Sequence, residues 1–175
     1  MRKVIFRVAN SLDNYIARDD HEIDWILGGE EASSAMEEFW EKIDTVVAGR
    51  KTYEPLLKSG KPWLSFPGVK NYVLSRTIRD TPDKNVQIIS ENAAEFIRRL
   101  KNEQGGEIFV IGGGELANSL FEENLIDEIT LNIHPLLLGS GIPLFLPMER
   151  QIDLELLECK SFKNGCVVVR YRVKH

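Results

Sequence analysis

The sequence predicts an α/β fold, with a mixed, mainly parallel sheet of about eight strands, helices on both faces and a C-terminal antiparallel hairpin. Short apolar runs alternate with amphipathic helical patterns through the first three-quarters of the 175 residues, which is typical of a parallel sheet covered on both faces. Two strand-like runs then flank Asn164-Gly165, a strong hairpin signal. No repeat or long linker interrupts the pattern, so residues 1–175 are expected to form a single domain.

Each element follows from a local pattern. Strands are expected where apolar residues run between turn signals, at residues 4–9, 45–48, 71–75, 86–89, 107–111, 128–133, 154–162 and 167–173. Helices are expected where apolar residues recur at helical spacing, at residues 32–43, 52–58, 93–102 and from Gly114 to about residue 123. Ser33 or Ser34 is the expected cap of the first helix, and residues 10–29 are expected to form a long loop.

Composition narrows the class of protein. The net charge is −5, with 43% hydrophobic and 28% charged residues, which is ordinary for a globular domain and argues against nucleic acid or an anionic membrane as partner. No apolar run approaches the roughly 18 residues of a membrane span, and the N-terminus reads as a strand rather than a signal peptide. We therefore expect a cytoplasmic protein.

The two cysteines are not expected to form a disulfide. If Asn164-Gly165 is the whole turn, Cys159 faces Arg170 across the hairpin and lies about 13 Å along the strand from Cys166, which is too far for a bond. No C-x-x-C motif is present, so no metal site is expected, and the histidines are scattered at His21, His134 and His175.

The strongest candidate for a binding site follows the apolar run at residues 107–111. Here Gly112-Gly113-Gly114 leads into a helical pattern that begins with Glu115 and Leu116. Glycines let the backbone approach a ligand closely, and a helix start offers unpaired N–H donors to a phosphate. The alternative is a tight strand-to-helix turn.

Two other strand ends carry basic residues. One is Gly49-Arg50-Lys51-Thr52, whose side chains can bind phosphate oxygens; the alternative is a capped helix with solvated basic residues. The other is Leu74-Ser75-Arg76, where the arginine suits a phosphate monoester or is simply a surface residue. Because parallel strands end at one edge of a sheet, all three segments are expected at the same edge.

Five motifs in a fixed order carry a family resemblance. They are Ser11-Leu12-Asp13-Asn14-Tyr15-Ile16-Ala17, Gly49-Arg50-Lys51-Thr52-Tyr53, Leu74-Ser75-Arg76, Val110-Ile111-Gly112-Gly113-Gly114 and Gly139-Ser140-Gly141-Ile142-Pro143-Leu144-Phe145. In these motifs the chain resembles the dihydrofolate-reductase-like superfamily, and more closely the branch that includes the reductase domain of riboflavin-biosynthesis deaminase-reductases. The resemblance covers nearly the whole chain.

The resemblance implies an NADPH site. It implies a nicotinamide beside Ala9 and Ile16, and an adenosine 2′-phosphate beside Leu74, Ser75 and Arg76. It assigns the pyrophosphate and adenosine side to Gly49, Arg50, Lys51 and Thr52, and the other pyrophosphate face to Ile111, Gly112, Gly113, Gly114, Glu115 and Leu116. It also implies a cis peptide between Gly112 and Gly113. Asn14 stands where the riboflavin branch usually has glycine, and asparagine tolerates a left-handed backbone.

The substrate side departs from the folate reductases, whose acidic residue early in the first helix aligns near Ser33. Asp24 and Glu31 are candidate proton donors; their alternatives are a surface charge and a helix-start charge favoured by the dipole. Asp13, Trp25 and Trp63 are candidates to line the substrate cleft, although such aromatic residues often serve core or lid packing.

The function that the resemblance implies is hydride transfer from NADPH to a C=N or C=O group of a small heterocyclic or sugar-linked substrate, as in 5-amino-6-(5-phosphoribosylamino)uracil reductase. Dihydrofolate reductase activity, a non-catalytic nucleotide-binding module and a structural protein that kept the fold are the alternatives. The deaminase half, with its zinc-ligand motif, is absent. A homodimer is expected, because both faces of the closing hairpin are largely apolar and related reductase domains often pair there.

Overall fold

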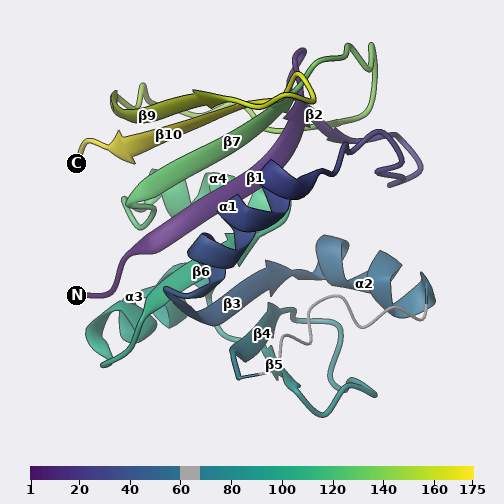
Figure 1. The fold of residues 1–175 in the computed structure, drawn as a ribbon. Helices are drawn as coiled ribbons and strands as arrows, with labels where there is room; N and C mark the ends of the chain where they lie inside the picture. Colours follow the sequence, from purple (N-terminus) through teal and green to yellow (C-terminus); the bar gives the residue numbers. More distant parts are fainter. Residues whose placement is uncertain (60–67) are drawn as a thin grey trace.

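A computed structural model of the chain describes residues 1–59 and 68–175. The main sheet contains β1 (Val4–Ser11), β3 (Ile43–Gly49), β4 (Lys70–Leu74), β5 (Val86–Ile89), β6 (Glu107–Ile111), β7 (Glu128–His134), β9 (Leu154–Ser161) and β10 (Val167–Val173). The helices are α1 (Glu30–Trp40), α2 (Arg50–Ser59), α3 (Ala93–Asn102) and α4 (Gly114–Glu122). Two short strands, β2 (Tyr15–Ala17) and β8 (Ile142–Pro143), form a separate ladder (Figure 1).

The main sheet has eight strands in the order β5-β4-β3-β6-β1-β7-β10-β9. Neighbours from β5 to β7 run parallel, while β10 is antiparallel to both β7 and β9. The predicted mixed sheet with a closing antiparallel hairpin is therefore confirmed.

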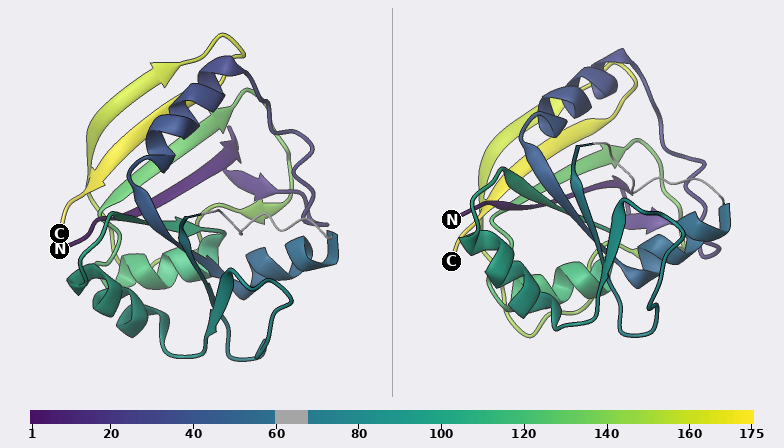
Figure 2. Two further views of the ribbon diagram at one scale, coloured as in Figure 1. Left: turned by 60° about the horizontal axis from the view of Figure 1, so that its bottom comes forward. Right: turned by 90° about the horizontal axis from the view of Figure 1, so that it is seen from below.

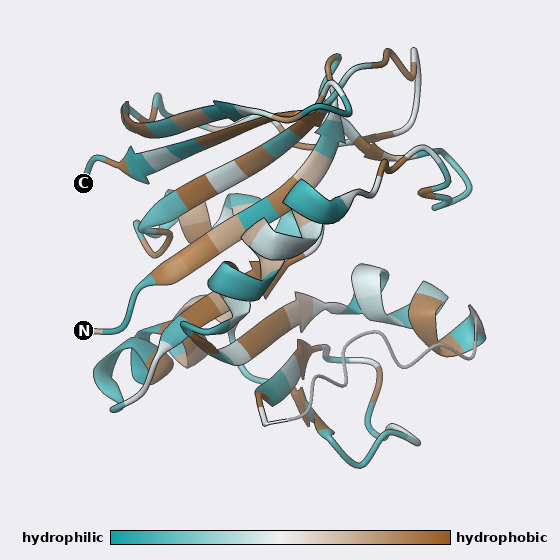
Figure 3. Cartoon of the chain, in the orientation of Figure 1, coloured by the Kyte–Doolittle hydropathy of each residue, from teal (hydrophilic) through white to brown (hydrophobic). Residues whose placement is uncertain are grey.

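Helices cover both faces of the sheet, as expected (Figures 1 and 2). On one face α3 and α4 pack on the larger core cluster, which contains Phe6, Val110 and Leu120. On the other face residues of α1 and α2 pack around Phe109 and Ile111. Figure 3 shows the hydrophobic residues concentrated along the central strands. None of the helices within the described ranges is long and apolar enough to cross a bilayer.

The first helix begins earlier than expected. Its N-cap is Gly29, so neither Ser33 nor Ser34 is the cap, and the Ser33 hydroxyl instead donates back to the Gly29 carbonyl at 3.1 Å. The acidic residues Glu30 and Glu31 occupy the first turn, where the helix dipole favours them. Residue 43 starts β3 rather than ending α1.

The expected loop at residues 10–29 contains β2, which pairs antiparallel with β8. Asn14 makes the turn from β1 into β2 with a φ of 65°, so the expected left-handed conformation is confirmed. The Asn14 carbonyl also accepts the Leu144 N–H at 2.8 Å, which attaches this turn to the C-terminal third of the chain.

The closing hairpin has a longer loop than predicted. Phe162 donates its N–H to the Cys166 carbonyl at 2.8 Å, and Gly165 turns the chain with a φ of 89°. The extra loop residue shifts the register by one, so Cys159 faces Val169 and the predicted pairing with Arg170 is wrong. Cys159 is exposed and Cys166 buried, and both thiols are free.

Candidate functional site

Three of the predicted site segments meet at one edge of the sheet. Ala48 of β3 pairs with Ile111 of β6, and Gly49 pairs with Leu74 of β4. The starts of α2 and α4 and the turn after β4 therefore lie beside one another, at the carboxyl ends of parallel strands where α/β proteins bind ligands.

The starts of α2 and α4 contact each other directly. Lys51 and Glu115 form an exposed ion pair across them. A Cβ placed on Gly112 would lie 2.2 Å from the Thr52 hydroxyl oxygen, and the φ of Gly112 is 120°. Only glycine fits at this position, because it has no Cβ and adopts positive φ readily.

The Gly112–Gly113 peptide bond is trans, so the expected cis bond is wrong. The chain makes the turn from β6 into α4 through the positive φ of Gly112 instead. Glycine adopts a positive φ readily whether the next peptide bond is cis or trans. The three glycines therefore do not by themselves require a cis bond.

Side chains from other segments close over the next two glycines. A Cβ on Gly113 would lie 2.9 Å from Cδ1 of Ile16, and one on Gly114 would lie 2.8 Å from Cγ of Leu146. The structure thus brings Ile16 of β2 onto the glycine segment. Ala9 lies on β1 beside Asn132 of β7, past the last residue pair that joins β1 to β6.

Backbone donors and basic side chains at this edge suit a phosphate-bearing cofactor. No side chain caps the N-terminus of α4, so its N–H groups are free to bind an anion. Arg50 is paired with Glu54 at 2.9 Å and Lys51 with Glu115. Arg76, by contrast, is exposed and has no carboxylate partner within residues 1–59 and 68–175.

Ser75 shapes the turn that presents Arg76. Its hydroxyl oxygen accepts the backbone N–H groups of Thr77 at 3.2 Å and Ile78 at 2.9 Å. Ser75 is buried, and its hydroxyl contacts the backbone of the turn rather than solvent.

The Asp13 carboxylate is already engaged. It accepts the Ser11 hydroxyl at 2.6 Å and the backbone N–H groups of Leu138 at 3.0 Å and Gly139 at 2.8 Å. These hydrogen bonds lower the pKa of Asp13 below its ordinary value, and the bond from Ser11 has the largest effect. Asp13 therefore joins the β1–β2 turn to the loop after β7.

The two candidate proton donors have partners away from the glycine segment. Asp24 is exposed and accepts the Arg18 Nε–H at 2.7 Å. This bond lowers the pKa of Asp24, whereas a proton donor at neutral pH needs a raised pKa. Glu31 accepts the backbone N–H of Lys163 at 2.9 Å. Asp24 thus forms a surface ion pair, and Glu31 is a carboxylate in the first turn of a helix.

Of the aromatic candidates, Trp25 is packed against the sheet. Trp25 is buried, and its ring meets His134 edge-on at 5.3 Å, which is a packing contact. Trp63 lies outside the described residues. Among the residues that the structure describes, no cluster of three His, Cys, Asp or Glu side chains could hold a metal ion.

A row of polar side chains beside the edge was missed by sequence reasoning. Thr130, Asn132 and His134 of β7 share one face with Arg7 of β1. Every second residue of β7 is polar, beginning with Glu128, and this period of two was the available signal.

The fold and this edge together define a dihydrofolate-reductase-like protein. Dihydrofolate reductase from Enterococcus faecalis, solved with NADP(H) and RAB-propyl, superposes with a TM-score of 0.71 at 16% identity, over 99% of this chain and 97% of that one. Within this class the chain belongs to the RibD C-terminal domain family, which matches residues 2–168.

Relatives of similar length support the assignment. YwjB of Bacillus subtilis strain 168, an uncharacterized protein, is 38% identical over 162 residues, or 92% of each chain. The uncharacterized YyaP of the same strain is 31% identical over 180 residues, covering 97% of this chain and 94% of YyaP.

Two further solved structures carry names from riboflavin biosynthesis. A protein from Shewanella sp. PV-4 named for that pathway superposes with a TM-score of 0.85 at 26% identity, over 99% of both chains. The Thermotoga maritima diaminohydroxyphosphoribosylaminopyrimidine deaminase/5-amino-6-(5-phosphoribosylamino)uracil reductase superposes with a TM-score of 0.75 at 16% identity. The match covers 99% of this chain and 57% of the Thermotoga chain. The chain thus shares its fold with proteins that are named as reductases.

Proposed function

We propose that the protein is an NADPH-dependent reductase that transfers a hydride to a C=N or C=O group of a small heterocyclic or sugar-linked substrate. The observation that carries the proposal is the convergence of three strand ends at one sheet edge. This edge offers an uncapped helix N-terminus and an arginine without a carboxylate partner in the described ranges, Arg76.

The fit of the edge to NADPH supports the choice of cofactor. The N-terminus of α4 and the start of α2 would bind the pyrophosphate, and Arg76 would bind the 2′-phosphate. Ala9 and Ile16 would line the nicotinamide. The cofactor supplies the hydride when bound, while the chain holds its phosphates, orients the ring and excludes water. A structural neighbour was solved with NADP(H).

For the substrate, a compound like 5-amino-6-(5-phosphoribosylamino)uracil is the first candidate, because a neighbour of the same fold is named for its reduction. Dihydrofolate is the second candidate. The folate reductases' acidic residue aligns near Ser33, and Ser33 is exposed and bonded to the Gly29 carbonyl, which disfavours folate.

The test begins with the purified protein titrated with NADPH and with NADH, read by thermal unfolding. A ligand that binds the native state raises the melting temperature, and we expect a larger rise with NADPH. NADPH oxidation is then followed with pyrimidine ribosylamines and with dihydrofolate. Binding without turnover would favour a nucleotide-binding module, and the absence of any shift would refute the cofactor assignment.

We expect the protein in the cytoplasm.

We also propose that two copies of the protein pair through the β9–β10 hairpin. Strand β9 is exposed along nearly its whole length, and Leu156 on it is 56% exposed. Light scattering should give the mass of a dimer, and Leu156→Glu should give that of a monomer with unchanged NADPH binding. A monomeric wild-type protein at micromolar concentration would refute this pairing.

A further inference from the structure

The sheet face beneath α1 carries polar side chains at several positions where a core would be apolar. Arg7 of β1, Thr130 of β7 and Arg170 of β10 are direct neighbours across three strands. Ala9, Asn132 and Val168 form the next row toward the carboxyl ends of the parallel strands. Helix α1 lies over this face (Figure 1), yet none of its own residues is fully buried.

Arg7 is a part-buried cation without an anion. Its guanidinium lies 4.7 Å from the centre of the Phe39 ring of α1, and it makes no ion pair with any carboxylate in residues 1–59 and 68–175. Residues 60–67 contain no Asp or Glu. Burial lowers the pKa of Arg7, which shows the cost of desolvating its charge.

The ring contact leaves most of the hydrogen-bonding capacity of Arg7 unused. An aromatic ring interacts with the flat face of a guanidinium, whereas the five N–H donors lie in its plane. A desolvated charge is unfavourable unless an opposite charge or hydrogen-bond acceptors compensate it. The N–H donors of Arg7 are therefore available to an acceptor that the described residues do not supply.

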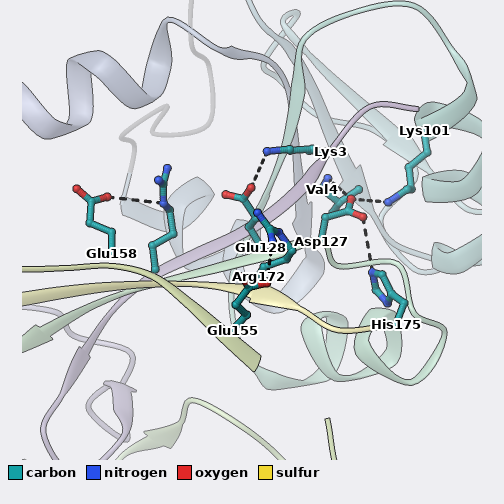
Figure 4. A network of polar contacts seen from close by, with 10 residues as sticks. Lys3, Val4, Lys101, Asp127, Glu128, Glu155, Glu158, Arg172 and His175 are labelled. Atoms are coloured by element: carbon teal, nitrogen blue, oxygen red, sulfur yellow. Dashed lines mark hydrogen bonds and ion pairs between the residues drawn. The ribbon is translucent and has the colours of Figure 1, made fainter. Parts of the chain in front are cut away.

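Charges on the adjacent row are balanced, whereas those on the Arg7 row are not. The adjacent row contains Glu128, Arg172 and Glu155. Lys3 pairs with Glu128 at 2.6 Å and Arg172 with Glu155 at 2.7 Å, as Figure 4 shows. In the Arg7 row the carboxylate of Glu158 faces Arg170 on β10, at 3.6 Å from its Nε. One positive charge thus remains in excess on this row.

Two other polar atoms near Arg7 lack a hydrogen bond within the described residues, although one of them, the Nε of Arg170, has Glu158 as its ion-pair partner. The Nε of Arg170 is buried and makes no hydrogen bond within the described part of the chain, and neither does the Oδ1 of Asn132. Arg7 and Arg170 are separated by two strand spacings, about 9.6 Å, with the buried Thr130 between them.

We propose that Arg7 and Arg170 bind an oxyanion of the substrate, a carboxylate or a phosphate ester. The row begins on β1, whose other neighbour in the sheet, β6, leads into the candidate cofactor edge. A molecule held by its anion beneath α1 extends along β1 toward Ala9, where the nicotinamide is proposed. The identity of this anion as part of the substrate rests on the proposed reductase function, but the anion site itself can be tested without it.

The experiment measures the melting temperature of the protein against inorganic phosphate and, separately, acetate, with and without saturating NADPH. We expect a concentration-dependent rise that persists with NADPH, since the two sites are distinct. In Arg7→Gln the apparent affinity for the anion should fall at least about 10-fold. A response to acetate as well as phosphate indicates a carboxylate-accepting site, and a response to phosphate alone indicates a phosphate ester.

The ligand-free proteins provide a second readout. Because Arg7→Gln removes a desolvated charge, it should melt at the same temperature as the wild type or higher. Arg172→Gln, the matched control one row away, should keep the full anion response, and Arg170→Gln should weaken it. Arg76→Gln should lose only the part of the phosphate response that disappears when NADPH is bound.

Three results would overturn the proposal. One is a lower ligand-free melting temperature for Arg7→Gln with an unchanged anion response, which would make Arg7 structural. Another is a phosphate response that Arg76→Gln abolishes and Arg7→Gln does not, and the third is no response to either anion. If the anion response depends on Arg7 but the protein binds no NADPH, the proposed function is refuted and the proposed anion site is supported.

Discussion

The Asp13 carboxylate accepts the backbone N–H of Gly139 at 2.8 Å, across 126 residues of sequence. Together with the bond to Leu138, it attaches the β1–β2 turn to the loop after β7. Strand β2 carries Ile16, which lies against Gly113. Asp13 therefore holds one wall of the candidate nicotinamide site without pointing into it.

This attachment predicts a pH dependence of stability. The pKa of Asp13 is lowered in the folded protein from 3.8, so its contribution is present above that value and is lost as the pH falls through the lower folded pKa. Urea unfolding of the wild type should show a larger loss of stability between pH 7 and pH 3 than unfolding of Asp13→Asn. Glu38→Gln, which removes an exposed charge on α1, should behave like the wild type, and an equal loss in all three proteins would contradict the prediction.

Arg76 should set the preference between cofactors. Arg76→Ala removes a charged donor from the proposed 2′-phosphate site and should weaken NADPH by about 10- to 100-fold while leaving NADH nearly unchanged. Fluorescence titration with both nucleotides measures the two affinities. Arg79→Ala, a nearby matched loss of charge, should leave both affinities near the wild-type values. If the two affinities of Arg76→Ala fall equally, the arginine does not bind the 2′-phosphate.

Gly112 should tolerate no side chain. Gly112→Ala places a Cβ 2.2 Å from the Thr52 hydroxyl oxygen at a φ of 120°, and we expect a loss of about 1–3 kcal/mol in the free energy of unfolding. Gly139→Ala is the matched control, because its φ of 77° is also positive but nothing lies within 4 Å of the new Cβ. Equal losses in the two variants would show that the contact with Thr52 is unimportant.

Asp127 anchors the opposite end of the sheet (Figure 4). It accepts the Val4 N–H at 2.7 Å and pairs with Lys101, whose side chain is 8% exposed. Asp127→Ala leaves that ammonium buried and unpaired, which should lower the free energy of unfolding by about 3 kcal/mol.

Replacing the lysine as well should restore part of this stability, so Asp127→Ala with Lys101→Met is the informative double variant. Glu155→Ala breaks an exposed pair with Arg172 and should change the stability by less than about 1 kcal/mol. Denaturant unfolding of the three variants compares these values. A double variant less stable than Asp127→Ala alone would contradict the role assigned to the ion pair.

The main elements could be predicted because each has a clear local pattern. Helix α3 has the expected bounds, Ala93–Asn102, since its apolar spacing is regular and Asn92 caps it through two backbone N–H groups. Strands β5 and β6 also have the expected bounds, because both are short apolar runs between turn signals. The three strand ends came together because parallel strands must end at one edge.

The remaining features depend on contacts distant in sequence. Strands β2 and β8 are too short for a periodic pattern, and they exist because they pair with each other. The hairpin register depends on whether Lys163 belongs to the loop. The partners of Asp13 and Glu31 are backbone groups far along the chain, so sequence alone could not show that these carboxylates were engaged.

The position of β1 in the sheet has a consequence for how the protein is made. The first strand of the chain is a central one, and it pairs with β6 at Ile108 and with β7 at Glu128. Such distant pairings give a high contact order, which slows folding. During synthesis β1 leaves the ribosome long before either partner, and a nascent chain that ends before residue 128 exposes an unpaired apolar strand edge. Chaperone binding to stalled chains should therefore fall once β7 has emerged.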